Sequence, residues 1–286
     1  MKYEYIDDDE KLHGFLEHIK TLGSIAVDFE GEFNLHIYGE HLCLIQIFDG
    51  SVYYIIDPRS RKLSRNALLE FFASDVEKVW FDAQSDNALV FKSYGVTINS
   101  IYDVRALAKA LGFMGNLIAL EQEYLGVKPE IGDKKRLQQT NWLKRPLSDE
   151  QLSYALSDVT YLHELKKVLW EKVVENGVEK DALYQLKAAS AKPKQTAPWT
   201  KLCSPRDLSR EQKAALKEYF IARDCIARRF NVPAFHVLDK HKIIALAKAC
   251  PKTLSEVYAI IEPVPPRFAS CLKETMKTAF DRLHGE

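Results

Sequence analysis

The chain has 286 residues, of which 47% are hydrophobic and 28% charged, and its formal net charge is zero. This is an ordinary globular composition, enough for one large domain or two of medium size. A membrane-spanning protein is excluded because the sequence contains no run of eighteen apolar residues.

The start of the chain and its cysteines bear on its location. The first residues, MKYEYIDDDEKL, are acidic and lack the apolar core of a signal peptide. The five cysteines are scattered and form no C-x-x-C pair. We therefore expect free, buried thiols and a cytoplasmic protein.

The net charge hides a division along the chain. Residues 1–180 hold 21 Lys and Arg against 29 Asp and Glu, whereas residues 181–286 hold 19 against 11. An acidic part joined to a basic part fits a metal-using catalytic domain beside a domain that binds a polyanion. It also fits two domains that merely attract each other.

The first 130 residues predict a mixed sheet. Buried strands are expected at 24–31, 41–48 and 51–58, with the turn dipeptide DG between the last two. A helix at 64–74, a strand at 78–81, a helix at about 86–95, a strand near 96–101 and helices near 103–111 and 116–126 follow. Hairpin-linked strands followed by alternating helices and strands indicate an α/β fold.

The rest of the chain predicts helices in two groups. An apolar stripe runs through 148–177, beginning at the capping box of Ser148 and Gln151 and ending at Gly177. The helical pattern continues to about Ala189, and the polar, proline-containing segment 190–206 is expected to be a linker. Residues 207–286 read as all helix, so the expected domains are 1–189 and 207–286.

Two acids on the first strand suggest a metal site. Asp28 and Glu30 are two residues apart, so their side chains share one face of the strand. Like charges beside a buried strand are costly unless a cation neutralises them, and Mg²⁺ prefers oxygen ligands. Asp86 follows a later strand. The alternatives are an exposed strand end for the pair and a helix N-cap for Asp86.

A further acid lies in the segment YALSD. Tyr154 and Asp158 are four residues apart and would share one side of a helix. Taken alone, the pair is better explained as a tyrosine at the edge of the core and a solvated aspartate. Together with Asp28, Glu30 and Asp86, however, Asp158 would complete the acids of a two-metal site, in which two cations about 4 Å apart cleave a phosphodiester.

These segments resemble a known family. VDFEG, FDAQSD and YALSD are similar to the three motifs of the DEDDy 3′–5′ exonucleases, and residues 20–170 resemble ribonuclease D in order and spacing. The resemblance implies a ribonuclease H-like mixed sheet flanked by helices and two Mg²⁺ or Mn²⁺ ions. Asp28, Glu30 and Asp158 would be the main ligands, Asp86 would complete the second site, and Tyr154 would position the attacking water.

The C-terminal part resembles an HRDC domain over about 207–283, a small helical module that binds nucleic acid. Among its basic residues, Arg228, Arg229 and Lys242 are candidates for contacts with phosphates, as are Arg223, Lys240 and Lys248. Each could equally lie on a solvated helix face, so the argument for a polyanion rests on their collective charge.

The function expected from these features is metal-dependent 3′–5′ exoribonuclease activity on structured precursors such as tRNA 3′ ends, releasing nucleoside 5′-monophosphates. A DNA exonuclease and a non-catalytic nucleic-acid-binding scaffold are the alternatives. A zinc site and a nucleotide cofactor are not expected, because the sequence has no H-E-x-x-H, Walker or G-x-G-x-x-G motif.

Overall fold

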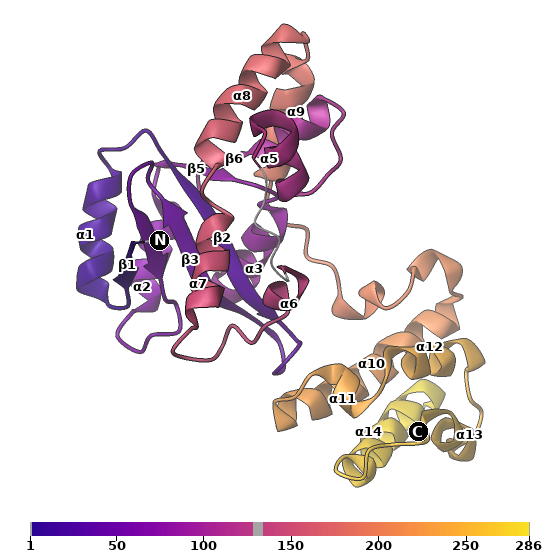
Figure 1. Ribbon diagram of the computed structural model, residues 1–286. Helices are drawn as coiled ribbons and strands as arrows, with labels where there is room; N and C mark the ends of the chain where they lie inside the picture. Colours follow the sequence, from indigo (N-terminus) through magenta and orange to yellow (C-terminus); the bar gives the residue numbers. More distant parts are fainter. Residues whose placement is uncertain (1, 128–133, 286) are drawn as a thin grey trace. The chain divides into compact units, whose positions relative to one another are not determined.

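The computed structural model describes residues 2–127 and 134–285 and divides into two compact units (Figure 1). The first unit comprises residues 1–32 and 40–193, and the second comprises residues 33–39 and 194–286. Within the described ranges, every helix is too short or too polar to traverse a lipid bilayer.

The first unit contains a sheet and the helices that cover it. Its strands are β1 (Tyr3–Ile6), β2 (Ser24–Phe33), β3 (Glu40–Phe48), β4 (Tyr53–Ile56), β5 (Glu77–Trp80) and β6 (Ile101–Asp103). Its helices are α1 (Asp9–Ile19), α2 (Arg65–Ala73), α3 (Gln84–Tyr94), α4 (Val104–Ala110), α5 (Leu117–Leu125), α6 (Lys134–Gln138), α7 (Asp149–Ser157), α8 (Leu162–Glu175) and α9 (Glu179–Ala189).

The sheet is mixed, as the sequence predicts. Its six strands lie in the order β1-β4-β3-β2-β5-β6. β3 and β4 are antiparallel, with Ile45 opposite Ile56, whereas β1 pairs with β4, β2 with β5 and β5 with β6 in parallel. The predicted turn between β3 and β4 is confirmed, since Gly50 has a φ of 99° that favours glycine. β2 therefore lies in the interior of the sheet, between β3 and β5.

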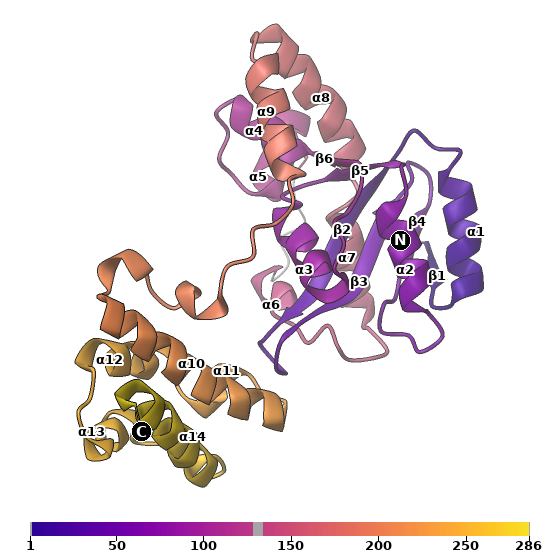
Figure 2. The ribbon, with the colours of Figure 1, turned by 180° about the vertical axis from the view of Figure 1, so that it is seen from behind.

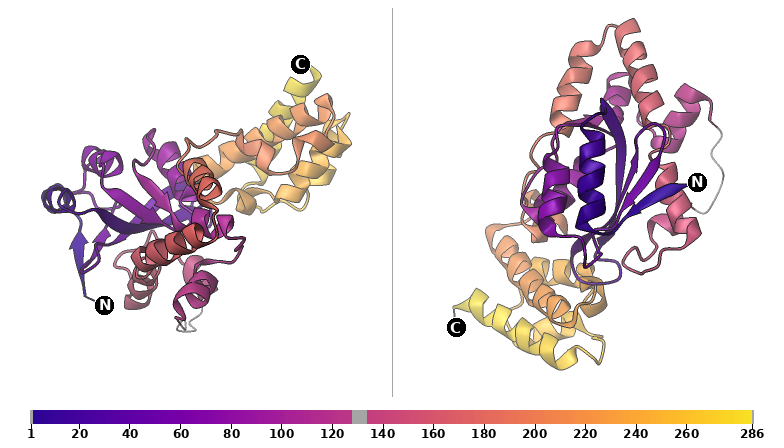
Figure 3. Two further views of the ribbon diagram at one scale, coloured as in Figure 1. Left: turned by 90° about the horizontal axis from the view of Figure 1, so that it is seen from above. Right: turned by 90° about the vertical axis from the view of Figure 1, so that its left-hand side faces the viewer.

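Helices cover both faces of this sheet (Figure 3). On β4, Tyr54 and Ile56 join one apolar cluster with residues of α1, α2 and α3. Ile55, between them, joins a different cluster with residues of α7. Because successive side chains of a strand point to opposite faces, α7 and α2 pack on opposite sides of the sheet.

The N-terminal segment differs from the expectation, because β1 and α1 were not predicted from the sequence. β1 has four residues, and its place depends on its parallel pairing with β4, which local patterns do not reveal. The strand expected near 96–101 lies at Ile101–Asp103 instead. All five cysteines are free, as expected, but only Cys43 is buried. Cys225 is exposed, and the other three (Cys203, Cys250 and Cys271) are partly buried, so the expectation of burial holds fully for Cys43 alone.

The apolar stripe at 148–177 forms two helices instead of one. α7 ends at Ser157 and α8 begins at Leu162. The hydroxyl of Ser157 donates to the carbonyl of Tyr154 at 2.6 Å, and that of Thr160 donates to the carbonyl of Leu156 at 3.0 Å. These hydroxyls satisfy carbonyls that the helix leaves without partners, so the chain can turn here while Val159 remains buried.

The C-terminal part of the second unit, residues 207–285, is helical, as predicted. It contains α10 (Arg210–Phe230), α11 (Ala234–Val237), α12 (Lys240–Ala249), α13 (Leu254–Ile261) and α14 (Ala269–His284), preceded by the short 3₁₀ helices η1 (Pro198–Lys201) and η2 (Pro205–Asp207). The long helix α10 packs against α11, α12 and α14 (Figure 2). Ser209 and Gln212 form a capping box at the start of α10. Thr253 caps α13 by accepting from the amide of Glu256, but Glu256 itself accepts from Lys252.

Candidate metal centre

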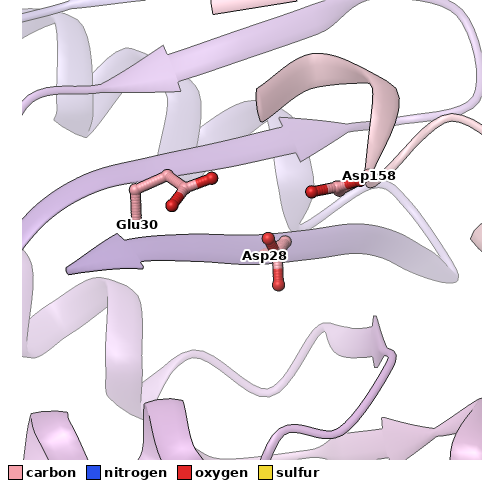
Figure 4. A group of neighbouring side chains, drawn as sticks. All are labelled: Asp28, Glu30 and Asp158. Carbon is pink, nitrogen blue, oxygen red and sulfur yellow. The ribbon is translucent and has the colours of Figure 1, made fainter. Parts of the chain in front are cut away.

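Three carboxylates from two elements come together beside the sheet. Asp28 and Glu30 project from β2, and Asp158 lies at the C-terminal end of α7. One carboxylate oxygen of each residue lies within 4.8 Å of one from each of the others. In Figure 4 the side chains of Glu30 and Asp158 point toward each other above Asp28. The structure thus brings together three of the four acids that the sequence predicts as metal ligands.

The two acids of β2 lie inside the strand and not at its end, because the strand continues to Phe33. Alternation places them on one face, while Val27 and Phe29 join the apolar cluster on the other. Only 9% of Glu30 is exposed. The alternative of an exposed strand end with solvated acids is therefore wrong for this pair.

Burial and mutual repulsion both disfavour negative charge at these sites. Burial, followed by the charges of Asp86, Asp158 and Glu30, raises the pKa of Asp28 well above its ordinary value. Burial and the charges of Asp158 and Asp86 likewise raise the pKa of Glu30. The cluster therefore favours bound protons or bound cations over bare carboxylates.

Asp86, the fourth predicted acid, lies apart from the group of three but close enough to repel it. It occupies the first turn of α3, whose N-cap is Ala83, so the alternative N-cap interpretation is wrong. The indole of Trp80 donates to its carboxylate at 2.9 Å. Burial raises the pKa of Asp86 to about 7, although this hydrogen bond opposes the shift.

Tyr154 projects from α7, the helix whose C-cap is Asp158. Its ring lies 6.2 Å from that of Trp142, centre to centre, and the side chain is buried. Burial and the charges of Asp158 and Glu30 raise the pKa of the Tyr154 hydroxyl. The group therefore stays a neutral phenol, which can hold a water molecule by a hydrogen bond but cannot act as its base.

Gln46 belongs to the surroundings of the cluster, although sequence reasoning did not select it. Its side-chain amide donates to Asp28 at 2.8 Å, and the residue is fully buried on β3. This hydrogen bond fixes the orientation of the carboxylate. The signal was present in the sequence as the one polar residue of the run LCLIQIF.

The chemistry of this donor set fits divalent cations. The ligand atoms would be carboxylate oxygens, the type that Mg²⁺ and Mn²⁺ take, and they converge within a few ångströms. Burial first, and the charges of the neighbouring carboxylates second, raise the pKa values of Asp28 and Glu30, so the cluster without cations combines buried charge with mutual repulsion. Cations would relieve this repulsion without displacing the buried strand.

The basic residues proposed to contact phosphates have partners inside the second unit. The ammonium of Lys242 donates to the carbonyls of Ile261 and Pro263, at 2.6 and 2.8 Å. Arg228 donates to the hydroxyl of Tyr38 at 3.2 Å, and Arg229 lies over the ring of Phe230. Of the further candidates, Arg223 is buried, whereas Lys240 and Lys248 are exposed.

Comparison with protein families gives two matches. Residues 3–174 match the family model described as 3′–5′ exonuclease, and residues 212–274 match the HRDC domain. The first match covers β1 through most of α8, so it includes all five residues expected at the site.

Known proteins give consistent similarities. The chain is 28% identical over 261 residues to ribonuclease D of Jannaschia sp., covering 88% of this chain and 67% of the relative. It is 29% identical to exosome complex component 10 of Mus musculus, covering 92% of this chain but only 30% of the relative. Its fold is similar to that of Escherichia coli RNase D, an exoribonuclease involved in structured RNA processing, at a TM-score of 0.72 and 23% identity over 98% of this chain and 75% of that one. The fold is also similar to that of the RRP6 catalytic core of Trypanosoma brucei, at a TM-score of 0.74 and 21% identity over 99% of this chain and 80% of that one.

Proposed function

Because the chain belongs to the 3′–5′ exonuclease family, we propose that it is a divalent-metal-dependent exoribonuclease of the ribonuclease D type. It shortens RNA from the 3′ end and releases nucleoside 5′-monophosphates. The observation that carries the proposal is the convergence of Asp28, Glu30 and Asp158 within 4.8 Å, beside Tyr154 on the same helix as Asp158.

The metal ligands follow from the positions of the acids. Asp28, Glu30 and Asp158 would be the main ligands, and Asp86 would complete a second site. When bound, Mg²⁺ or Mn²⁺ supplies Lewis-acid chemistry that activates water and neutralises charge on the phosphate. Gln46 keeps Asp28 turned toward the cluster through its hydrogen bond.

Tyr154 would orient the attacking water. Its hydroxyl remains protonated because burial and two neighbouring carboxylates raise its pKa. A neutral phenol both donates and accepts hydrogen bonds, so it can hold water in line with the scissile bond. Its removal would therefore lower kcat more than it raises KM.

The proposed substrate is a structured RNA precursor, with tRNA 3′ ends as the example. The similarity to ribonuclease D and the HRDC match support RNA as the polymer. The excess of Lys and Arg over Asp and Glu in residues 181–286 supports a polyanionic partner. The free thiols are compatible with the cytoplasmic location that we also propose.

The test uses RNA labelled at its 5′ end and carrying a 3′-hydroxyl, incubated with Mg²⁺, Mn²⁺ or EDTA. We expect labelled products that shorten one nucleotide at a time, unlabelled 5′-monophosphates, and no reaction in EDTA. A tRNA precursor with a 3′ extension, DNA of the same sequence and the Asp28→Asn variant complete the set. The variant should bind RNA but lose hydrolysis, because a main metal ligand is removed.

Each other outcome has a distinct meaning. Faster degradation of the DNA than of the RNA would favour a DNA exonuclease. Binding without cleavage of either polymer, with both metals, would favour a non-catalytic scaffold. Undiminished hydrolysis by Asp28→Asn would remove that residue from the metal site.

A further inference from the structure

Arg145 lies outside the acid cluster, and all three nitrogens of its guanidinium group donate hydrogen bonds. It makes five hydrogen bonds, two of them to the carboxylate of Asp57, at 2.7 Å from Nε and 2.6 Å from Nη2. Nη2 also donates to the carbonyl of Cys43 at 2.7 Å, and Nη1 donates to those of Trp142 and Lys144, both at 2.8 Å. Such a planar, forked arrangement is available to arginine but not to lysine.

Its partner Asp57 is fixed at the junction of two strands. The amide of Asp57 donates to the carbonyl of Ile6 at 2.9 Å, next to the paired ends of β1 and β4. The hydroxyl of Tyr5 on β1 donates to the same carboxylate at 2.7 Å, and the amide of Arg59 donates at 2.9 Å. Although burial opposes it, these contacts, with that of Arg145 foremost, keep the pKa of Asp57 below its ordinary value. The carboxylate is therefore an ionised, immobile anchor.

Trp142 connects the Arg145–Asp57 pair to Tyr154. Trp142 is 1% exposed, its carbonyl is held by Arg145, and its ring packs near that of Tyr154. Three residues after Arg145, the capping box of Ser148 and Gln151 begins α7. Arg145 thus holds the backbone of the residue whose ring lies beside Tyr154, and it does so three residues before the chain enters the helix.

We propose that Arg145 and Asp57 are positioning residues that set the place of the Tyr154 hydroxyl for the reaction. The inference rests on the proposed function, in which Tyr154 orients the attacking water. Arg145 itself touches β3, the residue after β4 and its own chain segment, and none of these contacts is an acid of the cluster. Its effect on catalysis therefore passes through α7.

The test compares kcat and KM for 5′-labelled RNA in the full-length protein, Arg145→Gln and Arg145→Lys. Both variants lose the bidentate contact with Asp57, and Arg145→Lys retains the charge and most of the apolar stem. We expect kcat to fall on the order of tenfold, since a small displacement of an orienting group is costly, with KM changed less than about twofold.

A double-mutant cycle with Tyr154→Phe separates positioning from general structural damage. If Arg145 acts through the Tyr154 hydroxyl, Arg145→Gln has little further effect on kcat in the Tyr154→Phe background. A loss of kcat as large in that background as in the wild type would overturn the inference.

Arg65→Gln is the matched control. Arg65 also holds two backbone carbonyls, those of Ser93 and Tyr94 at 3.0 and 2.8 Å, but lies on α2, which packs on the opposite face of the sheet. The Arg65→Gln substitution should lower the unfolding temperature without lowering kcat.

Wild-type protein that cleaves no RNA would contradict the proposed function. Active wild-type protein with folded Arg145 variants of normal kcat would contradict only the positioning role. If Arg145→Gln fails to fold, Arg145→Lys and Asp57→Asn supply the same comparison.

Discussion

At the scale of single residues, the acids of the site oppose folding when no cation is bound. A carboxyl group whose pKa is raised in the folded state binds more protons there than in the unfolded chain. Asp28, Glu30 and Asp86 all have raised pKa values, chiefly because they are buried. A group of this kind lowers the free energy of unfolding as the pH rises from its unfolded pKa to its folded pKa.

This reasoning predicts a stability that depends on both pH and metal. In EDTA the unfolding temperature should fall as the pH rises from about 4 to about 7, because the pKa of Asp86 is raised from its ordinary value of 3.8 to about 7 in the folded protein. At pH 8, Mg²⁺ at about 100 times its Kd adds about 2.7 kcal/mol, or roughly 5–10 °C. Thermal unfolding followed by circular dichroism measures both effects.

The control for this prediction is Asp28→Asn, which removes one buried charge and one main ligand. In EDTA at pH 8 it should unfold at a higher temperature than the wild type, and its response to Mg²⁺ should be smaller. If the unfolding temperature changes with neither pH, nor Mg²⁺, nor the substitution, the cluster neither destabilises the fold nor binds metal.

At the scale of elements, the break between α7 and α8 determines where the third acid lies. The apolar stripe of 148–177 continues through the break, since Val159 and Leu162 are both buried, so periodicity predicts one helix. The observed break depends on hydroxyl contacts of Ser157 and Thr160 that the hydrophobic pattern does not encode. Asp158 therefore lies at a helix end and not within a helix.

The contrast between local sequence patterns and specific contacts also explains which other residues could be predicted from the sequence. The carboxylates were identifiable because buried charges on an apolar strand are unusual, as with Asp28 and Glu30. The only sign of Gln46 in the sequence was its position as a single polar residue in an apolar run. Arg145 offered no local signal, because its partners Asp57 and Cys43 are 88 and 102 residues away in the chain. Contacts of this range are visible only after the sheet is assembled.

The capping box of α7 provides a test at this scale. Ser148→Ala removes the side-chain acceptor for the amide of Gln151, which should cost about 1 kcal/mol and loosen the start of the helix. Because α7 carries Tyr154, kcat should fall as well. Hydrogen exchange of the α7 amides and single-turnover kinetics measure the two effects.

Ser209→Ala is the corresponding change in the second unit, where Ser209 and Gln212 form the same capping box at the start of α10. It should speed exchange at the start of α10 by a similar amount and leave kcat unchanged. Equal losses of kcat in the two variants would mean that the order of α7 has no special connection with the reaction.

At the scale of the whole molecule, charge is divided between the two parts of the chain. The part with the acid cluster has 8 more acidic than basic residues, and residues 181–286 have 8 more basic than acidic ones. An acidic surface repels a polyanion, so attraction of RNA must come from basic side chains elsewhere. The second unit can supply this attraction without taking part in hydrolysis.

Within the second unit, the contacts and exposure of the basic side chains show which of the candidate residues are accessible to phosphates. Lys242 is held by two carbonyls and Arg223 is buried. Lys240 and Lys248, at the two ends of α12, are exposed and therefore accessible to a ligand in solvent. Counterion release makes such contacts measurable through their dependence on salt.

We therefore expect the double variant Lys240→Gln/Lys248→Gln to raise KM for RNA at low salt while kcat stays within about twofold. Each lost phosphate contact should reduce the slope of log KM against log salt concentration by about 1, so the two together should reduce it by about 2. The control variant, Lys20→Gln/Lys109→Gln, removes the same charge from exposed positions of the acidic first unit. If both variants change the slope equally, attraction depends on net charge alone and the second unit has no particular part in holding RNA.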